Sequence, residues 1–137
     1  MSVSFPELQA IRLGFGLSPL MAPVETVAEV LDSVTASTMA GDGITLGQAR
    51  EAATRLSELG KARRQGDGTA TGPYRDFLRE LGQLPMVDLR RRLARAVDAP
   101  AGVGERLVQF WADHFTVRAN AVGVHMLRLA FVDEAIR

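Results

Sequence analysis

The chain has 137 residues, of which 47% are hydrophobic and 23% charged, and this is the composition of a globular protein rather than a disordered one. Sixteen basic and sixteen acidic side chains cancel, so no net charge favours nucleic acid as a partner. The absence of cysteine excludes disulfides and thiolate metal sites, and the two histidines are too few for an all-histidine metal site.

The first 40 residues predict two helices with a turn between them. Pro6 is typical of a first helical turn and Gly14 of a helix stop, which together predict a short helix near the start of the chain. Pro23 predicts the start of a second helix. Its apolar side chains recur at helical spacing at Val24, Val27, Val30, Leu31 and Val34.

A polar arm is predicted at about residues 45–72. Thr45 and Gln48 form a T-x-x-Q capping box, which opens a helix that runs to about Gln65. Residues 65–72 (QGDGTATG) have the composition of a mobile linker. Because the apolar stripe of this helix is thin, we expect the segment to lie at the periphery rather than in the core.

The second half predicts four more helices. Pro73 and Pro85 each predict the start of one, and residues 100–104 separate these from a final pair, whose second helix runs from about Val122 to Arg137. The expected core comprises Leu107, Phe110, Trp111, Leu127 and Phe131, joined by Val103. If Trp111 is a core residue, Trp111→Ala should lower the free energy of unfolding by about 3–5 kcal/mol. No alternating strand pattern competes, so we predict a single all-α, mostly antiparallel, bundle-like domain of five to seven helices over residues 1–137.

The last predicted helix is apolar all round, which is typical of a helix that packs against several neighbours. We therefore expect the chain to be an amino-terminal fragment of a larger helical protein. A missing carboxy-terminal region, an unknown protein partner or a second copy of the chain would cover this helix. No stretch is long enough to span a membrane. Prolines and glycines interrupt the one candidate signal peptide, which leaves the location open, with the cytoplasm as the default.

Two motifs have ordinary structural interpretations. Gly14-Phe15-Gly16 lacks the preceding strand and the third glycine of a phosphate-binding loop, so we interpret these glycines as structural. The basic cluster at Arg90–Arg92 and Arg95 spreads around its helix and has no interleaved aromatic residues, which favours a solvated face over nucleic-acid binding.

The motif FWADHFT (residues 110–116) supplies the candidate site residues. Trp111 and His114 lie three positions apart and share a helical face. His114 is either a packed structural histidine or an acid–base group in a pocket walled by Trp111, with Arg118 one turn later to bind an anion if the helix persists that far. The spacing predicts no metal site, because His114 and His125 do not form a ligand pair.

Four segments in this order resemble a bacterial family catalogued as domain of unknown function 1800. They are AIRLGFG (10–16), ERLVQFW (105–111), DHFTV (113–117) and FVDEAIR (131–137). The resemblance covers the amino-terminal part of the family pattern, and it implies no established activity, cofactor or catalytic residue. Family members are often linked to export, whereas this chain shows no convincing signal peptide.

Two classes of function therefore stay open. The leading hypothesis is a structural or interaction module of a larger protein, without a cofactor. The alternative is an enzyme, such as a hydrolase, whose site includes His114 and is completed by the missing carboxy-terminal region.

Overall fold

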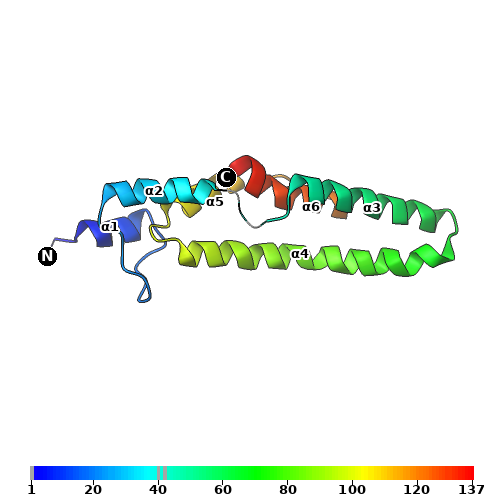
Figure 1. Ribbon diagram of the computed structural model, residues 1–137, viewed down its shortest axis with the longest axis horizontal. Helices are drawn as coiled ribbons and strands as arrows, with labels where there is room; N and C mark the ends of the chain where they lie inside the picture. The colour runs from blue at the N-terminus through cyan, green and yellow to red at the C-terminus, as the bar shows by residue number, and fades with distance from the viewer. Residues whose placement is uncertain (1, 40, 42) are drawn as a thin grey trace. The chain divides into compact units, whose positions relative to one another are not determined.

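A computed structural model describes residues 2–39, 41 and 43–137, and it confirms the all-α prediction (Figure 1). Within the described residues there are six α-helices and no strand. The α-helices are α1 (Phe5–Arg12), α2 (Val27–Thr38), α3 (Leu46–Arg64), α4 (Thr71–Asp98), α5 (Val103–His114) and α6 (Val122–Phe131). A short 3₁₀ helix, η1 (Gly68–Ala70), precedes α4, and a π-helical turn, η2 (Val132–Ile136), follows α6.

These elements form two units, which are described separately. Unit 1 comprises Met1–Ala40, Arg90–Thr116 and Ile136–Arg137, and unit 2 comprises Gly41–Leu89 and Val117–Ala135. In unit 1, α2 packs against α5, and in unit 2, α3 packs against α6. Helix α4 contributes its first part to unit 2 and its last part to unit 1. That residues 1–137 behave as a single domain stays a prediction.

Helix α1 begins with a capping box that the sequence analysis missed. The Ser4 hydroxyl accepts a hydrogen bond from the Glu7 amide, and the Glu7 carboxylate accepts from the Ser4 amide at 3.0 Å and from the Ser4 hydroxyl at 2.8 Å. These bonds to Ser4 hold the pKa of Glu7 below its ordinary value. Pro6 lies in the first turn and the helix ends at Arg12, close to the predicted glycine stop.

Helix α2 begins later than Pro23 predicted. Its first residue is Val27, and its N-cap is Thr26, whose hydroxyl accepts a hydrogen bond from the Glu29 amide at 3.2 Å. The threonine hydroxyl accepts a hydrogen bond from a free amide of the first helical turn, whereas a proline side chain has no acceptor to offer. The cap therefore decides where the helix starts.

Helix α3 has the predicted capping box, and one of its faces packs in unit 2. The Thr45 hydroxyl accepts from the Gln48 amide at 3.2 Å, and the Gln48 side chain accepts from the Thr45 amide at 2.9 Å. Ala49 is fully buried, and Leu56 and Leu59 pack against the core of unit 2. A stripe of small side chains suffices for this packing when the neighbouring helix approaches closely. The polar arm at about residues 45–72 stays a prediction.

The predicted linker after α3 is a short, hydrogen-bonded turn. The Asp67 carboxylate accepts from the Thr69 amide at 2.9 Å and from the Thr69 hydroxyl at 2.6 Å, and these bonds lower the pKa of Asp67. Ala70, in η1, is buried. Local side-chain bonds therefore fix a segment whose composition is typical of a flexible linker.

Helix α4 is one continuous helix of 28 residues rather than the two that Pro73 and Pro85 predicted (Figure 1). Pro85 lies inside it. A proline in a helix interior lacks the amide donor for the carbonyl four residues earlier, here that of Leu81, and costs about 3 kcal/mol. The helix nevertheless continues through Pro85, and the apolar face before the proline, which includes Phe77 and Leu81, is buried in unit 2.

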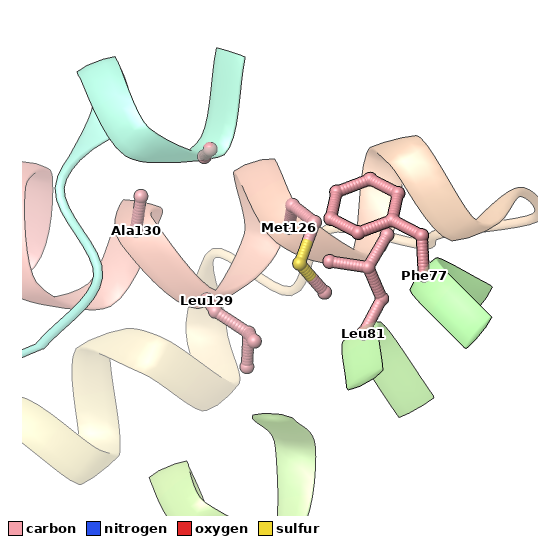
Figure 2. Packing of buried hydrophobic residues seen from close by; sticks show 6 residues of the cluster. Phe77, Leu81, Met126, Leu129 and Ala130 are labelled. Atoms are coloured by element: carbon pink, nitrogen blue, oxygen red, sulfur yellow. The ribbon is translucent and has the colours of Figure 1, made fainter. Parts of the chain in front are cut away.

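The core of unit 2 is a cluster of apolar side chains from three helices (Figure 2). Phe77 and Leu81 of α4 lie beside Met126 of α6, and Met126 is fully buried. The remaining members are Ala49, Leu129 and Ala130. The guanidinium of Arg55 lies 4.4 Å from the ring centroid of Phe77 and covers the edge of this cluster.

Helix α6 starts at Val122, as predicted, and continues from Val132 as the π-helical turn η2. The Glu134 carboxylate of η2 accepts a hydrogen bond from the Leu46 amide at 2.7 Å, which ties this turn to the first turn of α3. Within the described residues, no helix combines the length and the apolar character needed to cross a membrane.

Candidate functional site

His114 is the last residue of α5 and lies in a cluster of exposed aromatic rings. Its ring centroid lies 5.7 Å from that of Trp111 and 5.1 Å from that of Phe115, both edge-to-face, and 6.0 Å from that of Phe110 in a stacked arrangement. The Trp111 and Phe115 rings also stack, with centroids 5.6 Å apart. We call Phe110, Trp111, His114 and Phe115 the aromatic cluster.

The aromatic cluster is on the surface, which corrects the prediction for α5. Trp111 is 43% exposed, Phe110 57% and Leu107 43%, and the buried residues of α5 are Gly104, Glu105 and Val108. The expected core was therefore assigned to the wrong face of this helix. Of the other expected core residues, Leu127 is also exposed and Phe131 is half-buried.

The buried face of α5 is small because α2 approaches it closely. A Cβ atom on Gly104 would lie 2.7 Å from the carbonyl oxygen of Ser33 and would overlap the Ser37 side chain. The Ser37 hydroxyl donates to the Ser33 carbonyl at 2.9 Å, so the polar atoms of this contact are satisfied within α2. Glycine thus makes a helix contact that bulky side chains would prevent.

Arg118 does not follow His114 on the same helix. Helix α5 ends at His114, and Phe115 is its C-cap, with an amide that donates to the Trp111 carbonyl at 2.8 Å. Arg118 lies in the connection before α6 and belongs to unit 2. Because the helix does not persist to Arg118, His114 and Arg118 do not share a helical face. Functional roles for His114, Trp111 and Arg118 stay predictions.

The early glycine motif lies against the loop that precedes α5. A Cβ atom on Gly14 would lie 2.8 Å from the Ala101 carbonyl oxygen. Gly102 has a left-handed φ of 71°, and a Cβ atom on it would lie 3.0 Å from the Gly14 Cα atom. Gly16 also has a positive φ, 103°. Close approach and backbone conformation both require glycine here, which supports the structural interpretation of Gly14 and Gly16.

Arg106 connects the same turn to α5. Its guanidinium donates to the carbonyl of Arg12 at 2.9 Å and to that of Gly14 at 2.8 Å, which satisfies the carboxyl end of α1. The buried Gln9 amide donates to the Ala101 carbonyl at 2.9 Å. The motifs AIRLGFG and ERLVQFW therefore contact each other through main-chain atoms.

The strongest polar contact of unit 1 is a buried ion pair that the sequence analysis missed. Both guanidinium nitrogens of Arg137 donate to the Glu105 carboxylate at 2.7 Å, and the Arg137 and Glu105 side chains are only 3% and 7% exposed. Arg137 also donates to the Ser37 carbonyl at 2.7 Å. The one available signal was a glutamate between Gly104 and Val108 on the buried face, but no spacing rule connects it to a residue 32 positions later.

An apolar groove of about 510 Å³ lies in unit 1. Residues 14–19 and 21–23 form one wall, and residues 96, 97 and 99–102 form the other. No charged side chain lines it. Among the residues that the structure describes, no group of three or more histidine, aspartate or glutamate side chains has the geometry to hold a metal ion.

Comparison with known proteins identifies one family. No curated protein and no solved structure matches the chain. The sequence pattern of one family matches residues 9–137, a range that includes all four motifs and the contacts of Arg106 and Arg137. The chain therefore belongs to the family described as Protein of unknown function (DUF1800).

Proposed function

We propose that this chain is a helical module with a structural or interaction role, and that the exposed face of α5 binds another polypeptide. The observation that carries this proposal is the exposure of Leu107, Phe110 and Trp111 on one side of a single helix. A surface helix ordinarily has one apolar face, directed to the core. Helix α5 has a buried face with small side chains and a second apolar face, with the largest side chains, that is exposed.

The composition of this face is that of a binding surface. Tryptophan and phenylalanine are enriched in the centres of protein interfaces and contribute much of their binding energy. The rings of the aromatic cluster also contact one another, so little side-chain freedom remains to be lost on binding. A preorganised aromatic surface therefore supports an interaction role.

The polar residues of the family motifs support the same role. Arg106 binds main-chain carbonyls, and Glu105 binds Arg137. These bonds hold the fold of unit 1, which supports a structural role for both side chains. In this proposal the partner is the remainder of a larger protein, a separate protein or a second copy of the chain.

Photo-crosslinking in cells tests the proposal and separates these partners. A photoreactive phenylalanine analogue at Phe110 should give one discrete product, whereas the same analogue at Glu58, exposed on α3, should give none. An intramolecular product identifies the remainder of the same protein as the partner. A product of doubled mass identifies a second copy of the chain, and any other discrete mass identifies a separate protein. Equal labelling at the two positions, or none, contradicts the proposal.

Stability measurements test whether the face is free in the isolated chain. Trp111→Ala should lower the free energy of unfolding by about 1 kcal/mol or less, because the side chain is 43% exposed and loses mainly its ring contacts. Urea denaturation followed by circular dichroism measures this change. A loss of 3–5 kcal/mol would place Trp111 in a core and remove the main support for a binding surface.

An enzyme whose site is completed by polypeptide outside these residues is the second candidate. The observation that favours it is the exposure of His114, since an imidazole that reaches solvent beside aromatic walls is available for acid–base catalysis. In a longer protein of this family, His114→Gln should then abolish a measurable activity with unchanged stability. Retention of activity in that variant would eliminate His114 from catalysis.

A further inference from the structure

A second groove, with a volume of about 500 Å³, lies in unit 2 between the first turn of α3 and the outer side of α6. Large apolar side chains form most of its wall, and they are partly exposed rather than buried in the core. These side chains are Leu46, Val117, Val124, Leu127 and Phe131. A groove of this size and composition is in the range of small-molecule binding sites.

Two cationic side chains line the same groove. Arg50 lies one turn after Leu46 on α3, and Arg128 lies one turn after Val124 on α6. Within the described part of the chain, neither guanidinium forms an ion pair. The groove therefore combines an apolar wall with two guanidinium groups and one carboxylate, that of Glu134.

The single carboxylate, Glu134, leaves the lining of the groove with an excess of one positive charge, and its position is fixed by a main-chain bond. Glu134 accepts a hydrogen bond from the Leu46 amide at 2.7 Å, so it closes the wall between η2 and α3. It belongs to the π-helical turn, a backbone form that is rare and found frequently at functional sites. The groove wall is thus fixed by a main-chain contact rather than by packing alone.

We infer that this groove binds a long-chain carboxylate, with the alkyl chain along Leu127 and Phe131 and the carboxylate at Arg50 and Arg128. Guanidinium groups form paired hydrogen bonds with a carboxylate, and such charge-assisted bonds are about twice as strong as neutral ones. The apolar wall removes the alkyl chain from water. One ligand class, an anionic head on an apolar tail, satisfies both features.

A volume of about 500 Å³ accommodates a single extended alkyl chain together with its head group.

The test compares three ligands with the same ten-carbon chain and different heads. Decanoate, decanol and decyltrimethylammonium are titrated into the full chain by calorimetry, below the concentrations at which they form micelles. Decanoate should bind about tenfold more tightly than decanol, because a charge-assisted hydrogen bond contributes on this scale. Decyltrimethylammonium should bind more weakly than decanol.

Variants locate the site. The double variant R50Q/R128Q should lose the preference for decanoate, whereas R75Q, an exposed arginine on α4, should keep it. Leu127→Gln should weaken decanoate and decanol equally, and Leu89→Gln, exposed on α4, should not. Circular dichroism of each variant confirms that it is folded.

Three outcomes would overturn the inference. They are the absence of decanoate binding, equal binding of all three ligands, and a decanoate preference that survives R50Q/R128Q. Because unit 2 holds this groove and the aromatic cluster lies in unit 1, none of these outcomes affects the proposed interaction role of α5.

Discussion

The two units achieve stability by different means. Unit 2 buries apolar side chains from α3, α4 and α6 around a fully buried Met126. Unit 1 relies on close main-chain contacts at Gly14 and Gly104 and on the buried Glu105–Arg137 pair. The difference shows that helical spacing of bulky residues locates a core only where side chains, rather than backbone and charge, fill the space between helices.

Arg137→Met should have the largest effect on unit 1. It leaves the Glu105 carboxylate buried without its partner, which costs about 3–5 kcal/mol of unfolding free energy. Trp111 is the one tryptophan of the chain and lies in unit 1, so its fluorescence in urea follows this transition.

The double variant Glu105→Leu/Arg137→Met sharpens this prediction. Replacing both members of a buried pair by apolar residues removes the uncompensated charge, so most of the lost stability should return. If the single and double variants are equally unstable, the unpaired Glu105 carboxylate is not the cause of the lost stability.

Met126→Ala is the corresponding experiment for unit 2. The side chain is fully buried among Phe77 and Leu81, and its truncation should cost about 2–5 kcal/mol. Met86→Ala, at a position that is 54% exposed on α4, should change stability by less than about 0.5 kcal/mol. If urea denaturation gives similar losses of unfolding free energy for the two variants, Met126 does not lie in the core of unit 2.

Gly104→Ala should destabilise unit 1 by about 1–3 kcal/mol, because the added methyl group overlaps Ser37 and forces α2 and α5 apart. The same substitution at Gly82, in the interior of α4 with open space around it, should stabilise the chain by about 0.5–1 kcal/mol. Thermal unfolding of both variants measures the difference in sign. A gain in stability from both would show that α2 and α5 do not approach as closely as described.

The smallest expected effect is the pH dependence of α1. The pKa of Glu7 lies below its ordinary value of 4.5, so its bond to Ser4 stabilises the fold above that pH and is lost as the pH falls through the lowered pKa. Ser4→Ala should therefore reduce stability more at pH 7 than at pH 3, as measured by urea denaturation at each pH. A difference that grows on acidification would contradict the capping box.

The sequence predicted those features that depend on neighbouring residues. The capping box of Thr45 and Gln48 and the start of α6 at Val122 are local signals, and both are confirmed. The continuity of α4 through Pro85 was not predictable in this way, because the local signal of a proline is that of a helix start or break.

The candidate site shows the same limit. Trp111 and His114 do lie together, as their spacing indicates, but whether that face is buried depends on α2 and on Gly104. The pairing of Glu105 with Arg137 depends on tertiary structure alone. Propensity and spacing contain no information about such distant partners.

Arg106 has a consequence for how this sequence can change over time. Its guanidinium binds the carbonyl oxygens of Arg12 and Gly14, atoms that every residue type possesses, and so it recognises the path of the main chain rather than its side chains. Substitutions at position 12 leave this contact intact. One terminal nitrogen of Arg106 donates to both carbonyls, so a shorter side chain at position 106 loses both bonds at once. Position 12 can therefore change without loss of the contact, whereas Arg106 cannot, and Gly14 is restricted by its own close approach to the Ala101 carbonyl.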